Sequence, residues 1–151
     1  MSAKLIGEVL DAFSEGLKLG HAATALLYVI AHRAHHETDH EHAGGKQRNA
    51  GGVMLNPREM WCTNQEMCKQ MGNTSNSSRK RAIDTLEALG LKVRVPYGHS
   101  KTGEPIYATG GPGHTAGVGR APKYRVPTPE QLRAAIVRQQ SAAALHRDEA
   151  T

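Results

Sequence analysis

Two helix start signals on either side of a glycine constrain this chain more than any other feature. Thr63 is followed three residues later by Glu66, the spacing of a capping box, in which the threonine hydroxyl accepts from the Glu66 amide and the Glu66 carboxylate accepts from the threonine amide. Ser75 is a favourable cap for a second helix. Gly72 lies between them and can end the first helix in the left-handed conformation. The pattern predicts two helices joined by a tight turn.

The second of these helices is predicted from Asn76 to about Leu89 and has two unlike faces. Apolar positions recur at helical spacing, and because successive residues lie about 100° apart, the polar positions fall on the opposite side. The apolar face holds Ala82, Ile83, Leu86 and Leu89, and the outer face holds Asn76, Ser77, Lys80 and Arg81, with Arg79 along the flank. One face is therefore expected to pack in a core while the other presents hydrogen-bond donors.

Upstream, the spacing of apolar residues predicts two further helices. One runs from Leu5 to Leu19, and a more apolar one from His21 to about His36 is expected to form the centre of the core. Glu37 to Gly52 lacks periodicity and is predicted to be a loop. Val53 to Trp61 predicts a short extended segment, which Pro57 restricts to a sheet edge or a turn.

Downstream, alternation from Leu91 to Tyr97 predicts a half-buried strand, with Lys123 to Val126 as an antiparallel partner. The glycine-rich residues 98–122 between them are predicted to be a long wing loop without packing of its own. Thr128 and Gln131 form a second capping box for a last helix, whose weak apolar stripe is expected to dock on the domain or on a second copy. We expect a domain at 1–127 and a C-terminal helix and tail at 128–151.

The segment from Trp61 to Val95 resembles the winged helix-turn-helix family of DNA-binding domains; it reads WCTNQEMCKQMGNTSNSSRKRAIDTLEALGLKVRV. It is similar in the aromatic and capping residues before the first helix, the glycine turn, the serine-capped recognition helix and the closing leucine, glycine and leucine. The resemblance covers roughly Leu19 to Val126 and implies a mainly α fold with a small β-wing, whose recognition helix enters the major groove.

Candidate DNA-binding residues follow from the helix face and from the resemblance. Short polar residues such as Asn76 and Ser77 suit phosphates or base edges at a helix N-terminus. Arg79 or Arg81 suits a guanine edge, whereas Lys80 suits a phosphate. The resemblance implies further contacts from the wing, where the basic residues are Lys92, Arg94, Lys101, Arg120, Lys123 and Arg125. The chain departs from the family where Arg79 stands at a usually apolar position, and where the turn is one residue longer.

Composition agrees with a duplex partner. Nineteen Lys and Arg against fourteen Asp and Glu give a net charge of +5, which favours polyanions. One Trp, one Phe and four Tyr supply few stacking surfaces for single strands.

Cys62 and Cys68 are expected to stay reduced, and no apolar run reaches the length of a membrane span. We expect a cytoplasmic protein that acts without a cofactor or a membrane.

Two weaker patterns carry alternatives. His32, His35, His36, His40 and His42 could bind a metal, although a solvated helix end or a pH-sensitive surface explains them as well. The glycines between 110 and 119 lack the Gly-Lys-Ser or Gly-Lys-Thr ending of a nucleotide loop. No nucleophile, base and orienting group form a recognisable catalytic set, so we do not expect an enzyme.

The sequence therefore predicts a sequence-specific double-stranded DNA-binding protein, a transcriptional regulator that acts as a homodimer on paired half-sites. One alternative in the same fold class is a replication or maintenance factor of a plasmid, phage or integrative element. Another is a protein-interaction module on a winged-helix scaffold.

Overall fold

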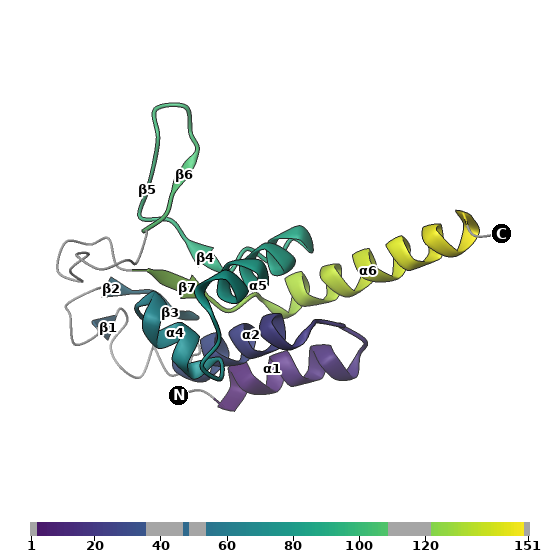
Figure 1. The fold of residues 1–151 in the computed structure, drawn as a ribbon, viewed down its shortest axis with the longest axis horizontal. Coiled ribbons are helices and arrows are strands. Elements are labelled where there is room, and N and C mark those ends of the chain that lie inside the picture. The colour runs from purple at the N-terminus through teal and green to yellow at the C-terminus, as the bar shows by residue number, and fades with distance from the viewer. Residues whose placement is uncertain (1–2, 36–46, 49–53, 109–121, 150–151) are drawn as a thin grey trace.

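The computed structural model describes residues 3–35, 47–48, 54–108 and 122–149, and these ranges are mainly helical with small antiparallel sheets (Figure 1). This confirms the expected mainly α composition. The helices are α1 (Ala3–Ser14), α2 (His21–Arg33), α4 (Asn64–Gln70), α5 (Asn76–Ala88) and α6 (Pro129–Glu149). The strands are β1 (Gln47–Arg48), β2 (Met54–Leu55), β3 (Glu59–Trp61), β4 (Arg94–Val95), β5 (Gly98–His99), β6 (Pro105–Ile106) and β7 (Lys123–Arg125).

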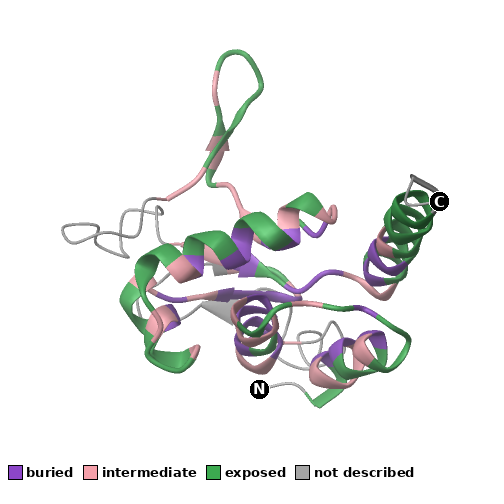
Figure 2. Ribbon diagram, turned by 45° about the vertical axis from the view of Figure 1, so that its right-hand side comes forward, coloured by how far each residue is buried: buried purple, intermediate pink, exposed green. Residues whose placement is uncertain are grey.

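The apolar helix α2 forms the centre of the core, as its composition predicts. It contacts α1, α4, α5 and β3. Leu26, Leu27 and Ile30 are fully buried, and each apolar side chain of this size removed from water stabilises a fold by roughly 1.5–3 kcal/mol. Figure 2 shows buried residues on the side of α5 that faces the core and exposed residues along its other side. The position of α2 therefore decides which face of α5 stays exposed.

A three-stranded antiparallel sheet in the order β3, β7, β4 lies beside the helices. The predicted pairing of 91–97 with 123–126 is confirmed in a shorter form, with Arg94 opposite Tyr124 and Val95 opposite Lys123. Leu91 is held by the end of α5 instead, because its amide donates to the Leu86 carbonyl. The pairing of β3 with β7 was not predicted, and it places β3 at the sheet edge; Pro57 lies in the turn before this strand, one of the two positions predicted for it.

Two short ribbons include residues predicted to be in loops. Within 37–52, Gln47 and Arg48 pair with Leu55 and Met54. Within 98–122, Gly98 and His99 pair with Ile106 and Pro105. The β5–β6 turn is closed locally, since the Ser100 amide donates to the Glu104 carbonyl at 2.8 Å. The expectation of one long loop over 98–122 was therefore wrong for 98–106, which form a short ribbon, and 109–121 lies outside the described residues.

The ends of the first and last helices follow local signals. α1 ends at Ser14, earlier than predicted, because Gly16 adopts a φ of 116° and the Leu17 amide turns back to the Ala12 carbonyl. The Thr128 and Gln131 capping box is confirmed in both directions, with bonds of 2.8 and 3.2 Å. Leu132, Ala135 and Ile136 join the same hydrophobic core as the other helices, while Val137 and Leu145 are exposed. The boundary proposed at residue 127 stays a prediction.

Arg58 ties α1, α2 and β7 together from the turn before β3. Its side chain is 7% exposed and pairs with Glu8 at 2.8 Å. It also donates to the Val126 and Pro127 carbonyls at 3.2 and 2.6 Å. Its amide donates to the His35 carbonyl, and its own carbonyl accepts from Val126. These bonds hold it at a φ of 69°, a conformation that costs a non-glycine residue free energy.

We expect Arg58→Met to lower the free energy of unfolding by roughly 3–5 kcal/mol, because it leaves Glu8 without this charge partner and two buried carbonyls without a donor. Urea unfolding followed by circular dichroism measures the loss. Arg133→Met is the matched control, since Arg133 is 59% exposed and pairs with exposed Glu130 at 3.6 Å; a loss below about 1 kcal/mol is expected there. Equal losses in the two variants would contradict the role given to Arg58.

Candidate nucleic-acid interface

Both α4 and α5 begin at capped N-termini, and the turn between them contains Gly72 and Asn73. Thr63 accepts from the Glu66 amide at 3.1 Å, and Ser75 accepts from the Ser78 amide at 3.1 Å. The reciprocal half of the predicted capping box does not form, because the Glu66 carboxylate accepts from Arg33 at 3.5 Å instead of from the Thr63 amide. Gly72 adopts a φ of 101°, which only glycine adopts readily, so the predicted helix stop is confirmed. Asn73 follows with a φ of 58°. The sequence therefore predicts both the existence and the position of this turn.

The outer face of α5 is exposed as predicted. Asn76, Ser77, Lys80 and Arg81 are exposed, whereas Ala82, Ile83 and Leu86 are at most 4% exposed. Leu89, expected in the buried face, is half-buried at the end of the helix. Side-chain donors thus gather over the first two turns of a helix whose other side is held in the core.

Arg79 lies inward, although its place in the sequence predicted a position on the flank that touches DNA. It is 6% exposed. Its Nε donates to Asn76 Oδ1 at 3.0 Å and its Nη1 to the Tyr124 hydroxyl at 3.5 Å. The cause is helical spacing, because residue 79 shares the buried face with Ala82, Ile83 and Leu86. Position 79, where the resemblance implied an apolar side chain, therefore holds a buried arginine.

The Tyr124 hydroxyl that accepts from Arg79 is a neutral phenol. Burial raises the pKa of the Tyr124 hydroxyl, and the nearby charge of Arg79 opposes this effect. The effect of burial is the larger, so the pKa is raised. The hydroxyl is therefore protonated at neutral pH and accepts from the guanidinium without neutralising its charge.

The basic residues of the expected wing fall into two groups. Lys92, Lys101 and Arg125 are exposed. Arg94 is engaged, because it donates to both Glu87 carboxylate oxygens at 2.8 and 3.0 Å and lies 4.0 Å above the Tyr107 ring. Lys123 is half-buried, 4.0 Å from Glu59 Oε1. Arg120 lies outside the described residues.

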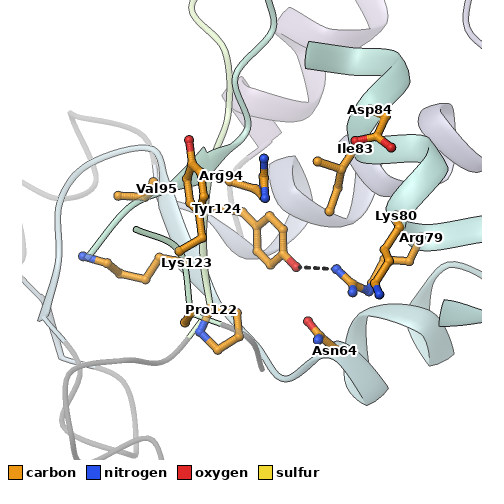
Figure 3. Close-up of a pocket in the computed structure, with 12 residues that line it drawn as sticks. Asn64, Arg79, Lys80, Ile83, Asp84, Arg94, Val95, Pro122, Lys123 and Tyr124 are labelled. Atoms are coloured by element: carbon orange, nitrogen blue, oxygen red, sulfur yellow. Dashed lines mark hydrogen bonds between the residues drawn. The ribbon is translucent and has the colours of Figure 1, made fainter. Parts of the chain in front are cut away.

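A pocket of about 420 Å³ opens between α5 and strands β4 and β7 (Figure 3). Its polar lining residues include Asn64, Arg79, Lys80, Asp84 and Tyr124. Its apolar lining consists of Ile83, Val95, Ala108 and Pro122. The remaining lining residues are Tyr107, Arg94 and Lys123. The sequence predicted the pairing of β4 with β7 that forms one wall of this pocket, but it did not predict the pocket itself; the local sign was the arginine at an apolar helix position.

Most of the histidine cluster lies outside the described residues, including His36, His40 and His42. Of the described pair, His32 stacks on Tyr28 with ring centroids 6.5 Å apart, and the His35 carbonyl accepts from the Arg58 amide. Within the described ranges no group of three or more His, Cys, Asp or Glu residues is placed to hold a metal. Metal binding by the whole cluster stays an untested alternative.

Comparison of the chain with known protein families, with curated proteins and with solved structures found no match. Among the described helices, none combines the length and the apolar character needed to cross a membrane. The function is therefore inferred from the geometry of the site.

The two cysteines beside this surface differ in environment. Cys62 is fully buried, and burial raises the pKa of its thiol to about 12, with nearby Arg33 opposing the shift. Cys68 is half-buried on α4. Because the thiolate is the reactive form, Cys62 is expected to be inert in the folded protein.

We therefore expect a thiol-specific reagent at neutral pH to label native protein at Cys68 well before Cys62, with denatured protein labelled at both. Mass spectrometry of the labelled peptides checks the order. Cys68→Ser should remove the early labelling and Cys62→Ser should preserve it. Early labelling at Cys62 would contradict the burial given to this side chain.

Proposed function

We propose that this chain is a double-stranded DNA-binding protein of the winged helix-turn-helix class, with α5 as the recognition helix. The observation that carries the proposal is the exposed polar face of α5, formed by Asn76, Ser77, Lys80 and Arg81, on a helix anchored by its opposite face. A helix that enters the major groove needs both a rigid support and an outer row of donors.

The arrangement around α5 supports the same function. The β5–β6 ribbon projects from the body on the side of the exposed face of α5 (Figures 1 and 2). Lys101 lies exposed in its turn. A duplex that lies along this face receives α5 in one of its grooves. The ribbon then lies beside the adjacent DNA backbone, where lysine ammonium groups bind phosphates.

We assign the contacts according to which side chains are exposed. Lys80 and Arg81 reach the duplex from α5, Arg81 being suited to a guanine edge and Lys80 to a phosphate. Asn76 holds Arg79 through its side-chain oxygen, which leaves its amide hydrogens for the duplex. Arg79 and Arg94 support this surface from inside, since both are engaged within the protein.

The biological role that fits this activity best is regulation of transcription by occupancy of paired half-sites. Replication or maintenance of a mobile element uses the same contacts, so the proposal concerns the DNA-binding step that both share.

We retain the homodimer as part of the proposal. α6 extends away from the body, with Val137 59% and Leu145 65% exposed (Figure 1).

The test is binding of the full chain to fragments selected from random duplex DNA, measured by fluorescence anisotropy at several salt concentrations. Lys80→Ala with Arg81→Ala should raise Kd at least about tenfold at fixed salt. It should also reduce the slope of log K against log salt by up to roughly 0.9 for each phosphate that the variant no longer binds.

Lys4→Ala with Lys18→Ala is the matched control. It removes the same charge from exposed positions in and just after α1, on the other side of α2 from α5. Affinity should change little. Equal weakening in the two double variants would mean that net charge alone attracts DNA, and absence of any enriched fragment would favour the protein-interaction module.

A further inference from the structure

Arg79 is a buried cation without a compensating anion among the described residues. Its side chain donates to an amide oxygen and to a neutral hydroxyl, at 3.0 and 3.5 Å. No carboxylate in the described ranges lies within ion-pair distance of it. A buried charge is costly unless it is paired, and a guanidinium has more donors than these two bonds use.

The surroundings of Arg79 keep its charge available to the pocket. Lys80 adds a second cation from the same helix turn. Asp84 is the carboxylate of the described lining, and Figure 3 shows it beyond Ile83, at the opposite end from Asn64 and the Tyr124 hydroxyl. The Arg79 end of the pocket is therefore the positive end.

The rest of the pocket is shaped for an organic body. About 420 Å³ exceeds what a single inorganic anion occupies and falls in the range of small-molecule sites, roughly 300–1,000 Å³. Ile83, Val95 and Tyr107, whose ring has the Arg94 guanidinium 4.0 Å above one face, provide apolar and aromatic surface. The other two cations of the lining, Arg94 and Lys123, are each paired with a glutamate outside it. The lining thus combines Arg79, which has no ion-pair partner among the described residues, with an apolar wall.

We propose that this pocket binds a small organic phosphate, with its phosphoryl group on Arg79, Lys80 and the Tyr124 hydroxyl and its planar or apolar body against Ile83, Val95 and Tyr107. Guanidinium and ammonium groups bind phosphoryl oxygens through charge-assisted hydrogen bonds, and the phenol adds a neutral donor. Because Lys80 also belongs to the outer face of α5, an occupied pocket competes with DNA for this lysine. The inference goes beyond DNA binding and stands without it.

Adenosine monophosphate is the probe, titrated into the full chain by calorimetry alongside adenosine and inorganic phosphate. We expect AMP to bind, inorganic phosphate to bind more weakly, and adenosine to bind at least about tenfold more weakly than AMP, since it lacks the charge. Lys80→Ala and Tyr124→Phe should each raise the Kd for AMP several-fold. Lys69→Ala, which removes an exposed charge on α4 outside the lining, should leave it unchanged.

Thermal unfolding of each variant without ligand verifies folding, and Lys80→Ala keeps the test valid if Tyr124→Phe unfolds, because Lys80 is exposed. Failure of AMP to bind the folded wild type overturns the inference, whatever the same preparation does with duplex DNA. Equal affinity for adenosine and AMP, or equal weakening by Lys69→Ala, overturns it as well. Loss of DNA binding with AMP binding intact would overturn the proposed function alone.

Discussion

The packing of α5 against α2 is the constraint on which the rest of the structure depends. α2 is apolar enough to bury residues toward several neighbours, and α5 meets it with Ala82, Ile83 and Leu86. Once this face is buried, helical geometry leaves Asn76, Ser77, Lys80 and Arg81 exposed. Arg79 also lies on the buried face, where Asn76 and Tyr124 accept from its side chain. Rotating α5 by one position would turn Lys80 or Arg81 toward the apolar core, so the core energetics also hold the exposed face in place.

Two buried arginines connect this helical core to the sheet, and they do so differently. Arg58 is paired with a carboxylate and with backbone carbonyls, so its charge is compensated and its role is structural. Arg79 meets Asn76 and Tyr124, which are neutral groups, and lies beside a pocket. Arg58 therefore stabilises the fold, whereas the charge of Arg79 is available to bind a ligand.

The sequence predicts well what local chemistry determines. The caps at Thr63, Ser75 and Thr128 and the exposed face of α5 depend on residues a few positions apart, and each is confirmed. The pairing of β3 with β7 joins residues distant in sequence and leaves no periodic signal, and the pocket depends on how α5 packs beside strands β4 and β7.

Arg79 and Arg94 show the same limit in the site. Their residue type suggested DNA contacts. However, tertiary packing brings Tyr124 to Arg79, and the turn after α5 brings Arg94 to Glu87, so both arginine side chains are bound within the protein. Residue type alone does not tell an exposed arginine from one engaged within the protein.

The most direct test of α5 as the recognition helix is to map the duplex on the protein by amide chemical shifts, with a selected DNA fragment added at low and at high salt. We predict that the largest shifts fall on residues 76–81 and on the β5–β6 ribbon, and that they decrease as salt rises. Shifts confined to α1 and α6, with 76–81 unmoved, would contradict this assignment.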